Sequence, residues 1–199
     1  MIVELLKEKT QSCHSAIERN ELLSLVVSSR LNLEIYFKIL EKFYGFFYSL
    51  ENKINRVPEL HVFDEILKPR HKTHLIKKDF ATLGWADGKI ASIPTCGILP
   101  ALNHPSQLFG VLYVTEGSTL GGQVIAKAIK NSIGVTGEHG GSFFNGYGAQ
   151  TFTMWQDTRA HIEAYSAQNP AAHSMIFEAA NETFACLGNW FNEGENFHE

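Results

Sequence analysis

The first residues that could do chemistry are Thr10, His14 and Glu18, which are spaced four residues apart. Residues at i, i+4 and i+8 share one face of a helix. A histidine on such a face could bind a metal ion through Nε2, while a carboxylate one turn away holds its other ring nitrogen. The spacing alone favours an ordinary His–Glu pair on an exposed helix, because the chain contains nine histidines.

A second group of residues is unusual for its glycines. Gly117, Gly121 and Gly122 lie in a segment that otherwise has helical periodicity. Each interior glycine costs a helix about 1 kcal/mol relative to alanine, so together they cost about 3 kcal/mol. Such a cost indicates either a kinked, smooth face on which a flat ligand could lie, shared with Ser118, or close packing between helices. The glycines alone do not decide between these two interpretations. No Gly-Lys-Ser/Thr sequence follows them, so a phosphate-binding loop is disfavoured.

The elements that would position these residues are helices. Apolar residues recur every three or four positions, and no strand hairpin signal or internal repeat competes with this pattern. We therefore predict an all-α fold with a single domain over residues 1–199. The expected helices are 2–19, a long helix capped by Asn32 and extending from Leu33 past Leu50, 71–83, 105–132, 151–167, and a last helix that ends near 192 and begins with Asn169 as N-cap and Pro170 at its first position. Loops are expected from Gly84 to Pro105 and over 134–150.

Composition narrows the class of protein. The 199 residues are 44% hydrophobic and 19% charged, which suits one globular domain with a sizeable core. The net charge of −4 and the absence of a basic stripe argue against nucleic acid as a partner. The short basic run from Lys68 to Lys72 is interrupted by a proline, and we expect it to be solvated surface.

Cysteine usage and the N-terminal residues indicate a location in the cell. Cys13, Cys96 and Cys186 are far apart and odd in number, which fits a reducing cytoplasm better than a disulfide framework. The first residues carry charges every few positions, unlike a secretory signal. No apolar run approaches the roughly 18 residues of a membrane span. We therefore expect a cytoplasmic protein without a membrane partner.

The two motifs together resemble one known family. The segment Thr10-Gln-Ser-Cys-His-Ser-Ala-Ile-Glu18 is similar to the proximal helix of heme oxygenases. The segment Tyr113-Val-Thr-Glu-Gly-Ser-Thr-Leu-Gly-Gly-Gln-Val-Ile125 is similar to their distal helix, particularly in the bacterial, biliverdin-forming branch. Both motifs have the order and separation typical of the family, and weaker similarities extend over nearly the whole chain.

The resemblance implies a fold and a reaction. The fold is a helical bundle that holds heme between a proximal helix and a kinked distal helix. The reaction is the oxidative cleavage of heme to biliverdin, CO and ferrous iron, with heme as both cofactor and substrate. It consumes O2 and takes electrons from an external reductant such as a ferredoxin or a flavoprotein reductase. Lys127 and Lys130, just beyond the distal motif, would suit an acidic electron donor.

The resemblance also implies roles for individual residues. His14 would be the proximal ligand of the heme iron, with Glu18 holding its other nitrogen. The catalytic distal wall would consist of Gly117, Ser118, Gly121 and Gly122. The remaining heme contacts would be Thr10 on the proximal helix, Lys7 and Arg159 at the propionates, and Phe184 in the pocket wall, where Phe143 could also lie.

One departure from the family pattern leaves alternatives open. Many members carry an aspartate where this chain has Ser118, and a serine must then donate or accept the corresponding hydrogen bond through water. A heme carrier or sensor without turnover, built on the same fold, is therefore an alternative. Thiaminase-like and quinone-cofactor-synthase-like proteins share the architecture, as do di-iron proteins. Di-iron sites need paired Glu-x-x-His motifs, which the sequence lacks.

Overall fold

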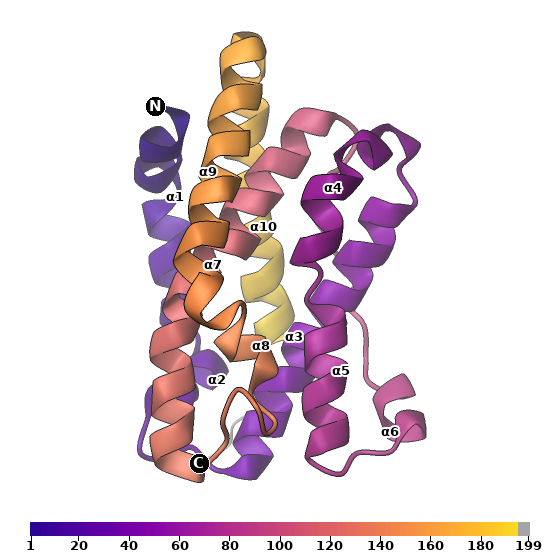
Figure 1. Cartoon of the computed structure of the whole chain (residues 1–199), viewed down its shortest axis with the longest axis vertical. Helices are drawn as coiled ribbons and strands as arrows, with labels where there is room; N and C mark the ends of the chain where they lie inside the picture. Colours follow the sequence, from indigo (N-terminus) through magenta and orange to yellow (C-terminus); the bar gives the residue numbers. More distant parts are fainter. Residues whose placement is uncertain (195–199) are drawn as a thin grey trace.

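The structure, a computed structural model, describes residues 1–194 and is built from helices (Figure 1). Pairing of the β type within this range is limited to isolated bridges at Thr136, so the predicted all-α fold is confirmed. The long helices are α1 (Ile2–Glu18), α3 (Leu33–Asn55), α5 (Thr73–Thr82), α7 (Pro105–Ile133), α9 (Thr151–Gln168) and α10 (His173–Asn192). The short helices are α2 (Glu21–Ser24), α4 (Asp64–Leu67), α6 (Asp87–Ala91) and α8 (Ser142–Asn145). The last five residues of the predicted domain lie outside the described range.

Several helix ends follow local sequence signals. The Asn32 side chain accepts a hydrogen bond from the Ile35 N–H, so the predicted N-cap of α3 is confirmed. Pro105 begins α7 as predicted, and α7 ends at Gly134, whose φ of 73° places it in the left-handed region that favours glycine. The loop expected over 134–150 contains the short helix α8.

The predicted start of the last helix is confirmed in position, since Asn169 precedes and Pro170 begins the helical segment, but Asn169 makes no side-chain cap. The Asn169 side-chain amide donates to the Tyr165 carbonyl oxygen at the end of α9, and it caps nothing in α10. A 3-10 turn over Pro170–Ala172 comes first, and α10 begins at His173. An asparagine can satisfy the end of the preceding helix as well as the start of the next, and the sequence alone does not distinguish the two.

The predicted solvation of the basic run is wrong for two of its cations. The Lys68 side chain is 69% exposed, but the side chains of Arg70 and Lys72 are each only 4% exposed. Both have carboxylate partners far along the chain, which explains why the local sequence did not reveal their burial.

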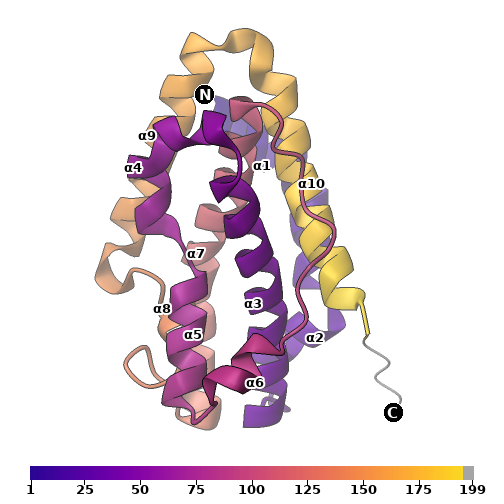
Figure 2. The ribbon, with the colours of Figure 1, turned by 90° about the vertical axis from the view of Figure 1, so that its right-hand side faces the viewer.

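Helix α7 lies in the middle of the bundle, where it contacts α9 and α10 (Figures 1 and 2). Helices α7 and α10 pack closely at Gly110, where an added Cβ would lie 2.3 Å from the Ile176 carbonyl oxygen. Any side chain at position 110 would therefore force the two helices apart. Helix α1 packs against both α9 and α10, so the four helices α1, α7, α9 and α10 form one group.

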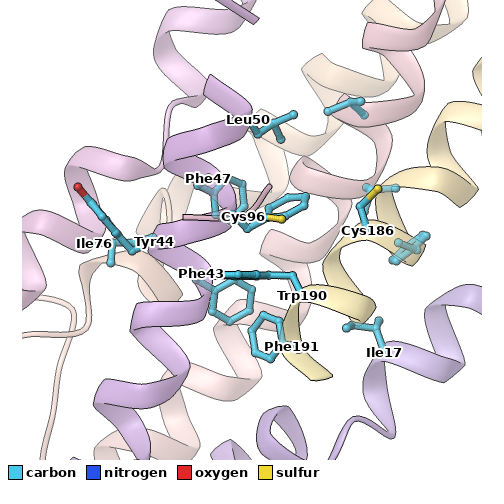
Figure 3. Close-up of a cluster of buried hydrophobic side chains, with 14 of the residues drawn as sticks. Ile17, Phe43, Tyr44, Phe47, Leu50, Ile76, Cys96, Cys186, Trp190 and Phe191 are labelled. Carbon is cyan, nitrogen blue, oxygen red and sulfur yellow. The ribbon is translucent and has the colours of Figure 1, made fainter. Parts of the chain in front are cut away.

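A second part of the core joins α3 to α10 and is largely aromatic (Figure 3). Phe43 on α3 contacts Phe191 on α10 edge to face, with ring centroids 4.9 Å apart. The Trp190 indole N–H donates to the Lys42 carbonyl oxygen at 2.7 Å. The connection from α6 to α7 runs along α3 and α10 (Figure 2). These contacts hold α10, and with it the Phe184 side chain, against the rest of the bundle.

None of the helices within residues 1–194 has a stretch that is long and apolar enough to cross a membrane.

Candidate functional site

A cavity of about 790 Å³ opens among α1, α7, α9 and α10. This volume lies in the range of roughly 300–1,000 Å³ that is typical of small-molecule sites. Of the site residues expected from the sequence, those that line the cavity are Lys7, Thr10, His14, Glu18, Gly117, Ser118, Arg159 and Phe184. Gly121 and Gly122 are not among the described residues that line it. The fold thus brings the first motif and the start of the second to the same cavity.

The α1 side of the cavity carries the histidine. His14 Nδ1 lies 3.5 Å from Glu18 Oε2, as the spacing of the two residues predicts. The imidazole also contacts the edge of Phe184, with ring centroids 5.6 Å apart. The His14 side chain is 53% exposed, because it faces the open cavity. The contact with Glu18 uses Nδ1, so Nε2 is the nitrogen that can bind a ligand.

Helix α1 is fixed in place at several points. The N–H groups of Ile2 and Val3 donate to the two carboxylate oxygens of Glu163 on α9, at 3.1 and 3.0 Å. A carboxylate at this end of a helix also interacts favourably with the helix dipole. Thr10, which is buried, donates from its hydroxyl to the Leu6 carbonyl oxygen at 2.7 Å. The position of the histidine therefore depends on α9 as well as on α1.

The α7 side of the cavity includes the bare backbone of Gly117 and the hydroxyl of Ser118, beside the side chains of Tyr113, Val114 and Leu120. Gly117 faces Trp155 on α9, and a Cβ added to Gly117 would lie 3.5 Å from the indole. The Ser118 hydroxyl donates to the Thr115 carbonyl oxygen at 3.0 Å, which leaves its lone pairs to accept hydrogen bonds. Helix α7 is unbroken, and Figure 1 shows that its two halves run in different directions.

The other two glycines of the motif have different surroundings. A Cβ added to Gly122 would lie 2.9 Å from the Phe144 carbonyl oxygen, so Gly122 permits close packing of α7 on α8. A Cβ added to Gly121 would have no neighbour within 4 Å. The two interpretations of the glycines therefore apply to different positions: Gly117 borders the cavity, and Gly122 serves helix packing.

Two cations lie at the cavity. Lys7 lines it from α1, and Arg159 lines it from α9. The Arg159 guanidinium is 3.1 Å from a carboxylate oxygen of Glu4, so this pair joins α9 to α1. An anionic group on a ligand would compete with Glu4 for Arg159, since guanidinium groups bind carboxylates strongly.

Two aromatic residues that line the cavity were not predicted from the sequence, and one aromatic residue that was predicted there lies elsewhere. Tyr113 and Trp155 both line it, with ring centroids 5.9 Å apart. Burial raises the pKa of Tyr113. Tyr113 begins the second motif, which was a usable signal, whereas Trp155 had none. Phe143, expected in the pocket wall, packs instead against Phe43 in the core, with ring centroids 4.8 Å apart.

A second cavity, of about 590 Å³, lies between the end of α1 and the end of α10. Phe184 and Cys13 border it, but none of the described histidines does. At its edge the side chains of Asn20 and Asn192 hydrogen bond to each other at 2.8 Å. Of the two cavities, the one lined by His14 is therefore the one in which a described histidine can meet a ligand.

The family model described as Heme oxygenase matches residues 1–193. A search of curated proteins found no significant match. Among solved structures, the NO- and CO-bound heme oxygenase from Neisseria meningitidis has a TM-score of 0.68 and 21% identity, over 98% of this chain and 94% of that chain.

Two further structures are similar over the whole chain. Heme oxygenase-1 from the cyanobacterium Synechocystis, in complex with heme, has a TM-score of 0.71 and 19% identity, over 98% of this chain and 92% of that chain. Heme oxygenase from Leptospira interrogans has a TM-score of 0.75 and 20% identity, over 96% of this chain and 98% of that chain. At these identities the structural likeness shows the fold.

Proposed function

The chain belongs to the heme oxygenase family, and from this premise we propose that it binds heme through His14 and cleaves it to biliverdin, CO and ferrous iron. The observation that carries the proposal is the meeting of His14 with the bare backbone of Gly117 and the hydroxyl of Ser118 at one cavity. The first residue supplies a ligand for iron, and the other two supply a wall without bulk beside it.

The residues of the cavity suit heme chemically. Heme has a flat apolar ring, one iron atom and two carboxylates on one edge. Apolar contacts are offered by Val3, Tyr113, Val114, Leu120, Trp155 and Phe184. His14 is the only histidine among the described lining residues, so it is the residue that would hold the iron. Lys7 and Arg159 supply positive charge for the propionates.

Each residue would have a separate task. His14 would bind the iron through Nε2, and Glu18 would orient the imidazole through Nδ1. Lys7 and Arg159 would fix the rotation of the ring in its plane, the latter by exchanging Glu4 for a propionate. Bound heme supplies both the iron that activates O2 and the ring that is opened.

The distal wall would control access to the ring edge. Gly117 has no side chain, so the backbone of α7 can lie close to the ring without blocking O2. The Ser118 hydroxyl can accept a hydrogen bond from a water in the cavity while it donates to Thr115, or rotate to donate to that water itself. It would therefore hold a proton source where many family members use an aspartate.

A carrier or sensor of heme is the second candidate, and one observation favours it. The acidic residues that line the cavity, Glu4, Glu8 and Glu18, all come from α1, and the described part of α7 contributes none. The α7 wall would then lack a carboxylate to deliver protons to the reaction. A carrier would bind heme as tightly and release it unchanged.

The test is the ligand role of His14. Hemin is added to the purified protein and to the variants His14→Ala and His74→Ala, and the Soret band is recorded. His74 is an exposed histidine on α5, away from the cavity, and serves as the matched control. We expect His74→Ala to behave like the wild type. We expect His14→Ala to lose the histidine-ligated spectrum and to regain it when imidazole is added. An unchanged spectrum in His14→Ala refutes the assignment.

The electron donor is proposed to dock beside the end of α7. Lys127 and Lys130 are exposed on α7 beyond the cavity, and an acidic ferredoxin or flavoprotein reductase would be attracted to them. Charge reversal at both residues should slow turnover driven by a ferredoxin and leave turnover driven by ascorbate unchanged. Equal rates with the ferredoxin before and after reversal would exclude this docking site.

A further inference from the structure

A buried cluster of charges lies directly behind the distal wall. Glu116, the residue before Gly117, has a side chain that is only 1% exposed. Its Oε1 lies 2.7 Å from Lys72 Nζ, an ion pair outside hydrogen-bond geometry, and its Oε2 accepts a hydrogen bond from the Tyr147 hydroxyl at 2.8 Å. Lys72 Nζ also donates to the Tyr147 oxygen at 2.6 Å, which closes a triangle around the carboxylate.

Arg70 extends the cluster to α9. Its Nε lies 3.7 Å from Glu116 Oε2 and donates to the Thr158 hydroxyl at 3.0 Å. Its outer nitrogen binds Asp157, the one carboxylate of the cluster at the protein surface. The cluster therefore joins α7 to the start of α5, to the turn before α9 and to α9 itself.

The cluster fixes both partners of one contact in the cavity. On α7, Glu116 is adjacent to Gly117. On α9, Thr158 is one turn after Trp155, the residue that Gly117 faces. A shift of the Glu116 carboxylate would move the backbone of Gly117 and Ser118 relative to Trp155, and so change the space above the heme.

A gain in stability does not by itself account for such a cluster. A buried ion pair loses hydration of both partners, and apolar residues of the same volume often stabilise a fold as well. Burial lowers the pKa of Lys72, while Glu116 acts against this shift. Burial also raises the pKa of Tyr147, which keeps its hydroxyl a donor to the carboxylate. A buried ion pair does, however, hold the two segments that carry it in one relative position, because every displacement leaves a charge without its partner.

We propose that Glu116 is a positioning residue, which acts through Lys72, Tyr147 and Arg70 to set how closely the Gly117–Ser118 backbone lies over bound heme. The proposal rests on the proposed function, since it concerns the same cavity. The cluster thereby determines the electrostatic surroundings of a ligand on the iron and the edge of the ring that the ligand meets.

The test compares Glu116→Gln with a matched control, Glu51→Gln. Glu51 accepts hydrogen bonds from the backbone N–H groups of Lys72 and Thr73, so its change weakens the same region while the side-chain contacts of Lys72 Nζ with Glu116 and Tyr147 stay in place. Three properties are measured: the melting temperature without heme, the C–O stretching band of the ferrous CO complex, and the ratio of biliverdin isomers formed. The C–O band is sensitive to polar groups near the ligand and requires no turnover.

We expect Glu116→Gln to shift the C–O band and to change the isomer ratio. We expect Glu51→Gln to lower the melting temperature while the C–O band stays that of the wild type. Tyr147→Phe, which keeps the ion pair and removes the two hydrogen bonds of the Tyr147 hydroxyl, should shift the band in the same direction by less. A wild-type band and isomer ratio in Glu116→Gln, whatever its melting temperature, would overturn the proposal.

Two further results separate this proposal from the proposed function. If Glu116→Gln does not fold, Tyr147→Phe decides: a shifted band supports positioning, and a wild-type band refutes it. If the wild type binds heme without cleaving it, the proposed function fails, and the C–O band still tests the position of the distal wall. If the wild type binds no heme, both fail together.

Discussion

The glycines of α7 allow a sharp test, because two adjacent positions have opposite surroundings. A Cβ at Gly121 would meet no atom within 4 Å, and a Cβ at Gly122 would lie 2.9 Å from the Phe144 carbonyl oxygen. Gly121→Ala and Gly122→Ala are thus the same chemical change in the same helix. They differ only in what the added methyl group meets.

The expected magnitudes follow from helix propensity and packing. Alanine in a helix interior is more stable than glycine by about 0.5–1 kcal/mol, so Gly121→Ala should raise the free energy of unfolding by that amount. Gly122→Ala gains the same amount, but forcing a methyl group against backbone costs about 1–3 kcal/mol. The net expectation for Gly122→Ala is a loss of up to about 2.5 kcal/mol.

Urea unfolding of the heme-free protein measures both variants. With a slope of about 1–3 kcal/mol per molar urea, the two midpoints should separate by several tenths of a molar or more, in opposite directions from the wild type. Gly117→Ala extends the series. Its Cβ would lie at an ordinary 3.5 Å from Trp155, so stability should rise as for Gly121→Ala, while hemin affinity falls because the methyl group enters the cavity.

Two results would contradict these expectations. If Gly122→Ala stabilises the protein as much as Gly121→Ala does, α7 and α8 are not in close contact at this position. If instead Gly117→Ala leaves hemin affinity and the C–O band unchanged, the bare backbone at Gly117 does not border the bound heme.

Two other predictions concern titratable groups. Burial raises the pKa of Cys186 to about 11, and Cys96 is also buried. A thiol reagent at pH 8 should therefore label only the half-buried Cys13 quickly, and rapid labelling of all three cysteines would contradict this. Burial raises the pKa of Tyr36 above its usual value near 10, so the folded state holds this proton more tightly than the unfolded state. Stability from Tyr36 is therefore complete below pH 10 and lost as the pH rises beyond it. The free energy of unfolding of Tyr36→Phe, followed by urea titration from pH 8 to 11, should fall less steeply with pH than that of the wild type, and equal slopes would exclude Tyr36 as the cause.

The sequence predicted the features that depend on neighbours along the chain. The pairing of His14 with Glu18 follows from helix geometry alone, and so does the capping of α3 by Asn32. Pro105 can begin a helix because its missing N–H would have no partner there. For such residues the relevant partner lies within one or two turns, and the spacing of residue types is sufficient.

The sequence failed where the partner lies far along the chain. The local sequence predicts a solvated Arg70. The prediction fails because the ion-pair partners of Arg70, Glu116 and Asp157, lie 46 and 87 positions later in the sequence. The meaning of Gly121 and Gly122 likewise depends on where α8 packs. No local pattern encodes these distances, so the cavity's supporting contacts became visible only in the folded chain.

Consumption of bound heme is what distinguishes a heme oxygenase from a heme carrier or sensor. The most direct measurement is the absorption spectrum of the hemin complex over time in air, with a ferredoxin system or ascorbate as reductant and catalase present. We expect the Soret band to decay while the absorbance of biliverdin grows. A Soret band that persists unchanged under these conditions would contradict the assignment and leave a heme carrier or sensor.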